Sequence, residues 1–156
     1  MRRRRDGAKQ EGRAVGEVRT RVTLTNAADE VLVRRGLLPP DQVRSYDADA
    51  MVDTGAVRCV LPQHVADRLG LALVGHRVAE YADGRLESVP ITEPFTLRIQ
   101  DREEQETALV LGDEVLIGQT ALEKMDLLPD CAKRRLIPNP AHPDQPVTKV
   151  KRATGE

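Results

Sequence analysis

The chain has 156 residues, of which 31% are charged and 40% hydrophobic, and its formal net charge is -1. This length supports one domain with its own core and excludes a two-lobed enzyme, while the balanced charge gives no overall attraction to nucleic acid or to a membrane surface. No apolar run reaches the length of a signal peptide or a transmembrane helix, so we expect a cytoplasmic protein without a membrane partner.

The N-terminal residues 1–15 are rich in charge and show no hydrophobic periodicity, so we predict a flexible basic tail. The one basic run extends from Arg2 to Arg5. A solvated, disordered start is the favoured interpretation of this run, and an arm that binds nucleic acid is the alternative. We therefore expect no nucleic-acid partner.

The first strands are predicted from the alternation of apolar and polar residues. Residues 18–25 alternate and indicate a half-buried strand. Residues 26–29 break this strand, and residues 31–40 fit either a short helix or an irregular crossing, two alternatives that stay open. Residues 42–47 and 50–53 are predicted as two further strands.

A helix is predicted where Leu61 is followed by Pro62. Proline suits the first helical position because its missing N–H would have no partner there. Leu61, Val65 and Leu69 share one face, and Gly70 provides the left-handed residue that commonly ends a helix.

An Asp-Gly pair indicates a β-hairpin in the middle of the chain. Residues 78–82 and 85–89 lie on either side of Asp83 and Gly84, which form a two-residue connection of the kind found in type I′ turns. The hairpin is therefore predicted to have a tight tip.

The remaining predicted elements are short. A charged turn is expected at residues 101–104, and Thr120 with Glu123 has the spacing of a capping box for a helix through Met125. The polar residues 141–156 are predicted to form a flexible C-terminal tail. The other predicted strands are residues 95–99, 108–111, 115–118 and 135–137.

The cysteines and histidines do not form a recognisable site. Cys59 and Cys131 are too few and too far apart for a disulfide framework or a zinc site, so we expect free thiols. The histidines His64, His76 and His142 lack the spacing of metal ligands. We therefore expect no metal and no cofactor.

The most informative stretch is Asp53, Thr54, Gly55 and Ala56. Two apolar residues place Asp53 at the end of a predicted strand, and glycine gives the chain room to reverse directly after it. Asp-Thr-Gly alone is a weak motif, and an ordinary turn that contains aspartate is the competing interpretation. The surrounding sequence has to distinguish the two.

That surrounding sequence resembles the retropepsin-like aspartic proteases, and most closely their small bacterial members. The similarity extends over residues 16–140 and rests on residues 52–56, on Leu61 with Pro62, and on Leu116, Ile117 and Gly118. It implies a mainly β domain, a closed β-barrel with two short helices, that acts as a homodimer.

The resemblance also implies roles for single residues. Asp53 would be the catalytic carboxylate, Thr54 would hydrogen-bond across the dimer axis, and Gly55, with Ala56 beside it, would approach the substrate. The apolar residues Leu116 and Ile117 with Gly118 would be structural and pack beneath the Asp53 turn.

The family has a β-hairpin flap that closes over the substrate and excludes water. The hairpin tip formed by Ala82, Asp83, Gly84 and Arg85 lies about thirty residues after the Asp-Thr-Gly motif and would correspond to it. An ordinary surface hairpin is the alternative interpretation, because this tip lacks the apolar, glycine-rich sequence of the viral flaps.

Amide hydrolysis by acid–base chemistry needs one group to accept a proton from water and another to donate one to the carbonyl oxygen. Two facing aspartates can do both, because like charges a few Å apart do not both ionise. The chain holds one Asp-Thr-Gly motif, so the second Asp53 must come from a second copy.

We therefore predict a homodimeric aspartic endopeptidase that acts on peptides or unfolded proteins. The alternative is a catalytically silent module of the same fold that binds peptides or serves in assembly. Two departures from the viral pattern bear on substrate contacts: Val57 stands where a polar or acidic residue is usual, and residues 27–46 have no viral counterpart.

Overall fold

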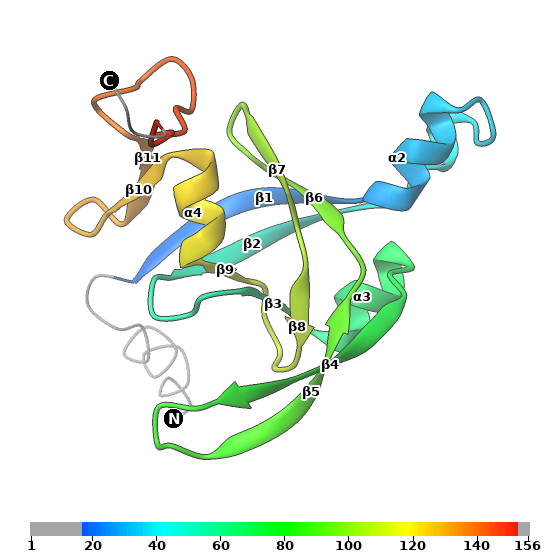
Figure 1. The fold of residues 1–156 in the computed structure, drawn as a ribbon, viewed down its shortest axis with the longest axis horizontal. Coiled ribbons are helices and arrows are strands. Elements are labelled where there is room, and N and C mark those ends of the chain that lie inside the picture. The colour runs from blue at the N-terminus through cyan, green and yellow to red at the C-terminus, as the bar shows by residue number, and fades with distance from the viewer. Residues whose placement is uncertain (1–16, 153–156) are drawn as a thin grey trace, which may run out of the picture.

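The structure is a computed structural model that describes residues 17–152 of a mainly β protein (Figure 1). The predicted tail of residues 1–15 lies outside the described residues. Within residues 17–152, no helix is long and apolar enough to cross a membrane. The strands are β1 Val18–Asn26, β2 Ser45–Asp53, β3 Cys59–Leu61, β4 Leu73–Glu80, β5 Leu86–Thr92, β6 Phe95–Ile99, β7 Arg102–Glu106, β8 Ala108–Val110, β9 Leu116–Gly118, β10 Leu127–Asp130 and β11 Arg135–Pro138. The helices are α2 Ala27–Arg34, η1 Pro40–Gln42, α3 Gln63–Leu69 and α4 Gln119–Met125.

Nine strands form one sheet in the order β4-β5-β8-β3-β9-β2-β1-β6-β7, and β10 pairs with β11 separately. The long antiparallel pair β1 and β2 joins its two halves, with α2 at one end of the pair and α4 near the other (Figure 1). The outer strands β4 and β7 do not pair with each other among the described residues, so the hydrogen-bonded closure expected for a barrel is not seen.

The core is aliphatic, because the chain has one phenylalanine and no tryptophan. Inward-facing residues of the sheet pack against the apolar faces of α3 and α4, as their period of two in strands and 3.6 in helices requires. Side chains that are almost completely buried include Leu24, Leu61, Leu69, Phe95, Leu97, Ile99, Ile117, Leu122 and Met125.

Several predicted elements are confirmed by the structure. The strand predicted at residues 18–25 is β1, and Gly70 ends α3 with φ of 63°. The two strands predicted at residues 42–47 and 50–53 are a single strand, β2. Pro62 precedes the helix as its N-cap residue, one position earlier than predicted.

Both alternatives for residues 31–40 hold in part, because residues 31–34 belong to the helix α2 and residues 35–39 are irregular. The described residues therefore contain three α-helices where two were predicted. The strand break predicted at residues 26–29 is confirmed, since β1 ends at Asn26 and α2 begins at Ala27. The side-chain oxygen of Asn26 accepts the backbone N–H of Asp29 at 3.0 Å and so caps α2.

Two further local predictions are wrong. The charged residues 101–104 do not form only a turn, because β7 begins at Arg102 and pairs with β6 at the outer edge of the sheet. Glu103 is exposed there, whereas Arg102 is buried and donates to the backbone carbonyls of Met125 and Asp126. The capping box at Thr120 is absent, since Gly118 is the N-cap residue and makes no side-chain cap. Glu123 instead accepts the amide of Gln119 at 3.2 Å.

The predicted hairpin exists, but its turn differs from type I′. A type I′ turn needs positive φ at both central residues, and at the tip only Gly84 has one, at 83°. Glu80 pairs with Leu86, so the connection is longer than two residues. Figure 1 shows the β4–β5 hairpin extending well beyond the body of the protein.

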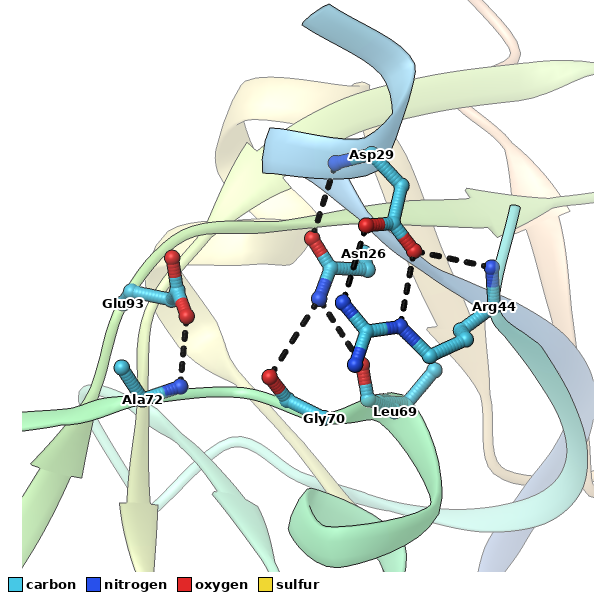
Figure 2. Close-up of polar contacts among 7 residues, drawn as sticks. All are labelled: Asn26, Asp29, Arg44, Leu69, Gly70, Ala72 and Glu93. Carbon is cyan, nitrogen blue, oxygen red and sulfur yellow. Dashed lines mark hydrogen bonds and ion pairs between the residues drawn. The ribbon is translucent and has the colours of Figure 1, made fainter. Parts of the chain in front are cut away.

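A polar network fastens the end of the β1–β2 pair that lies away from Asp53 (Figure 2). The buried carboxylate of Asp29 accepts two hydrogen bonds from the guanidinium of Arg44, both at 2.9 Å, and one from its backbone N–H at 3.0 Å. Asn26 donates to the backbone carbonyl of Leu69 at 2.8 Å. The network therefore joins α2, β2 and the end of α3.

A close backbone crossing fastens the other end. The parallel pairing of β2 with β9 places Gly118 beside Asp53. Beyond it, the backbone N–H of Gln119 donates to the carbonyl of Ala56 at 2.7 Å. A Cβ atom on Gly118 would lie 2.5 Å from the carbonyl oxygen of Arg58, so only glycine fits there.

We predict that Arg44→Ala lowers the free energy of unfolding by about 2 kcal/mol at neutral pH, the cost of removing charged hydrogen bonds from a buried carboxylate. Hydrogen bonds from Arg44 lower the pKa of Asp29. The stability that they contribute is present above the unfolded pKa, near 4, and is lost as pH falls through the folded value.

Urea unfolding at several values between roughly pH 2 and 7 tests this prediction, because the difference between wild type and Arg44→Ala should shrink toward the acid end. Arg21→Ala is the control, because Arg21, unlike Arg44, has no carboxylate within 4.0 Å in residues 17–152. A difference that stays constant across the pH range would contradict the role of the ion pair.

A second prediction concerns the backbone crossing. Gly118→Ala should lower the free energy of unfolding by about 3 kcal/mol, because the added methyl group meets backbone atoms that cannot turn away. Gly75→Ala is the matched control, since its Cβ would lie at an ordinary 3.7 Å from Ile91. Equal thermal stability of the two variants would show that the crossing is loose.

Candidate active site

Asp53 ends β2 and begins a tight turn. The backbone N–H of Gly55 donates to Asp53 Oδ1 at 2.9 Å, and the N–H of Ala56 donates to the Asp53 carbonyl at 3.2 Å. These bonds orient the carboxylate at the end of the strand. In the part of the chain that the structure describes, Asp53 has no cationic side chain within 4.0 Å, so its carboxylate is not used in an ion pair.

The residues that follow Asp53 in the turn are accessible. Thr54 and Gly55 are exposed, and Ala56 is half-buried. Within residues 17–152, the Thr54 hydroxyl makes no hydrogen bond to another side chain or to the backbone. The turn therefore presents a carboxylate and an unused hydroxyl at the surface.

The Asp53 turn opens onto a cavity of about 520 Å³ between the body and the β4–β5 hairpin. Its floor is apolar and includes Val60, Leu109, Leu111 and Leu116. Strand β4 from Arg77 to Glu80, together with Tyr81 directly after it, forms the opposite wall. The cavity is open to solvent along one side, so an extended chain could enter it without a change of fold.

The predicted site residues are only partly brought together. Asp53, Gly55 and Ala56 line the cavity, as does Leu116. Ile117 is buried, and Gly118 lies under the turn. The four tip residues do not line the cavity, which meets the hairpin at β4 instead; they are Ala82, Asp83, Gly84 and Arg85.

Several residues of the cavity wall carry no recognisable signal in the sequence. Arg58 and Arg77 lack any motif that would mark them, and only the strand alternation around residue 78 could have placed Arg77 on one face of the hairpin. Tyr81 also lines the cavity, with the guanidinium of Arg85 over its ring at 4.6 Å. These positions depend on the tertiary arrangement of the hairpin.

Cys59 lies next to the cavity wall but is not suited to nucleophilic chemistry. It is buried, and burial raises the pKa of its thiol to about 11. The thiol is therefore protonated at neutral pH, when it is a poor nucleophile. Among the described residues, no group of three or more His, Cys, Asp or Glu side chains could hold a metal ion.

The chain was compared with known proteins. No curated protein matches it. One similar solved structure is a foamy viral protease-reverse transcriptase in complex with an RNA/DNA hybrid, with 10% sequence identity and a TM-score of 0.44. The match covers 69% of this chain and 12% of the viral chain, so the chain spans a small part of that protein's length.

A family model gives the clearer result. The model of the gag-polyprotein putative aspartyl proteases matches residues 42–124, more than half of the chain. The matched region runs from the start of β2 through the Asp53 turn, the hairpin and β9 to most of α4. The chain therefore belongs to the gag-polyprotein putative aspartyl protease family, a retropepsin-like group.

Proposed function

We propose that the protein is an aspartic endopeptidase that works as a homodimer, with Asp53 from each copy at the active centre. The observation that carries this proposal is the position of Asp53, which sits in a hydrogen-bonded turn at the mouth of a peptide-sized cavity and has no cationic partner in residues 17–152. Membership of an aspartyl protease family supports it.

The chemistry needs two carboxyl groups that share one proton, the arrangement known for aspartic proteases. The ionised Asp53 takes a proton from water, whose oxygen attacks the peptide carbonyl carbon. The protonated Asp53 of the other copy gives its proton to the carbonyl oxygen. Collapse of the tetrahedral intermediate breaks the C–N bond, and the proton held by the first carboxylate passes to the leaving amine. A hydroxyl of the intermediate returns its proton to the second carboxylate as the C=O bond forms again.

Two features of the turn favour a second copy. The chain contains one Asp-Thr-Gly motif, so a dyad requires a two-fold axis close to Asp53. Thr54 is exposed and its hydroxyl is unused in the described part of the chain, which leaves it available to a partner. Neither feature would be needed if Asp53 worked alone.

The proposed substrate is an extended peptide or an unfolded protein segment. Strand β4 is the outermost strand of the sheet, so one edge of its backbone can hydrogen-bond to an extended chain in the cavity. The apolar floor around Leu109 and Leu116 suits an apolar side chain of that segment.

We predict that Asp53→Asn lowers hydrolysis of an unfolded protein mixture at least about 100-fold across roughly pH 4 to 7, because the amide can neither accept nor release the transferred proton. The appearance of new peptide amino termini measures the rate. Equal hydrolysis by wild type and variant would exclude Asp53 as the catalytic group. Peptide binding without cleavage by either protein would favour a silent binding module.

A second prediction tests the shared site. Wild type and Asp53→Asn chains are unfolded together, refolded at varying ratios and assayed at constant total chain concentration. If both carboxylates are required, activity falls with the square of the wild-type fraction, because mixed dimers are inactive. A linear fall, or full activity in a species that sediments as a monomer, would contradict the dyad.

A further inference from the structure

We propose that the cavity selects peptides that carry an acidic side chain, Asp or Glu, beside an apolar one, and that Arg58 and Arg77 bind this carboxylate. This inference rests on the proposed function, since it names the substrate class of the same site. It depends on two observations: both arginines line the cavity, and neither has a carboxylate within 4.0 Å in residues 17–152.

Arg77 is placed by the alternation of β4. It is paired with Val89, which is buried with 3% of its surface exposed, so the face that Arg77 and Val89 share is turned toward the body. Ala79 and Tyr81 lie on this same face and are half-buried. Arg77 therefore belongs to the side of the hairpin that covers the cavity.

Glu80 belongs to the other face of β4, although it also lines the cavity. Glu80 shares its face with Val78, which is 67% exposed, and is paired with Leu86, which is 65% exposed. This face is largely exposed to solvent, and Glu80 makes no ion pair with Arg77 within 4.0 Å in residues 17–152. Glu87 is paired with Ala79 and shares the face of Arg77, but its carboxylate accepts a hydrogen bond from the hydroxyl of Tyr81 and does not line the cavity.

Arg58 stands on the opposite wall and is placed by the Asp53 turn. Its carbonyl oxygen faces Gly118, so its backbone is held by the same crossing that holds the turn. Its exposed guanidinium donates to Thr107 Oγ1 at 3.2 Å, which uses one of its five N–H groups. The other groups are available to a ligand.

Neither cavity arginine has a carboxylate within 4.0 Å in residues 17–152, whereas other arginines do. Arg19, Arg44 and Arg98 each bind a carboxylate at 2.8 to 2.9 Å and stabilise the fold. Arg77 uses one nitrogen on the carbonyl of His76 at 2.9 Å.

A guanidinium in a partly closed cavity binds a carboxylate more strongly than one in open solvent, and does so with a defined geometry. An acidic side chain of the substrate would therefore gain a charged hydrogen bond at Arg58 or Arg77. Its apolar neighbour would lie on the floor formed by Val60, Leu109 and Leu116. This combination distinguishes the proposed substrates from purely apolar peptides.

The test measures binding without cleavage. Fluorescein-labelled nine-residue peptides with an apolar centre, differing only in Glu, Gln or Lys beside it, are titrated with the Asp53→Asn protein and followed by anisotropy. We expect the Glu peptide to bind about tenfold more tightly than the Gln peptide. The difference should shrink as salt is raised, because exposed charges are screened.

Charge reversal locates the contact. Arg58→Glu and Arg77→Glu, each made in the Asp53→Asn protein, should abolish the preference for Glu and favour the Lys peptide. Arg21→Glu is the matched control, since Arg21 is exposed and unpaired in the described residues but lies outside this cavity. Arg58→Gln and Arg77→Gln replace any reversal variant whose circular dichroism shows that it is unfolded.

The outcomes separate this inference from the proposed function. Cleavage by the wild type together with equal binding of the three peptides, or no binding of any, would overturn the inference and leave the protease standing. A preference for Glu that depends on the two arginines, without cleavage by the wild type, would support the inference and point to a binding module. A preference that survives both reversals would overturn the assignment to these residues.

Discussion

The organisation of the site depends on the close approach of Gly118 to the backbone of the Asp53 turn. The carbonyl oxygens of Ala56 and Arg58 lie within 3.0 Å of the place where a Cβ atom on Gly118 would stand. Strand β9 runs parallel to β2 here, so the same contact positions Asp53 at the end of β2 and the chain that leaves the turn. It also positions Leu116 of β9, which belongs to the apolar floor of the cavity. The backbone of Arg58, which follows the turn, is positioned by the same crossing.

The other end of the β1–β2 pair is held by chemistry of a different kind. A buried carboxylate, an arginine and an asparagine join three segments that are far apart in sequence (Figure 2). Such a network is fully satisfied only when α2, β2 and α3 are all in place, so it favours one arrangement of these elements over others. The long strand that ends in Asp53 is thus fixed at both ends before any substrate is present.

Local signals predicted much of this fold, and the failures have two physical causes. The alternation of β1, the left-handed Gly70 and the apolar strand before Asp53 are encoded by neighbouring residues, so they could be identified from sequence. The cap at Asn26, the edge strand β7 and the strand β10 have partners close in sequence, but their polar residues and Pro129 do not follow the apolar alternation that marks a strand. The two cavity arginines were missed for a different reason, because the wall that each one lines is set by the tertiary arrangement of the Asp53 turn and the hairpin.

The absence of tryptophan from the chain has a practical consequence for observing the hairpin. Its intrinsic fluorescence comes mainly from its two tyrosines, which lie in different regions of the protein. Tyr46 is half-buried in the body, in strand β2, whereas Tyr81 lies at the end of β4 against the cavity, beneath the guanidinium of Arg85. With Tyr46 replaced by phenylalanine, the remaining tyrosine becomes a native optical probe of hairpin movement, readable without any attached dye.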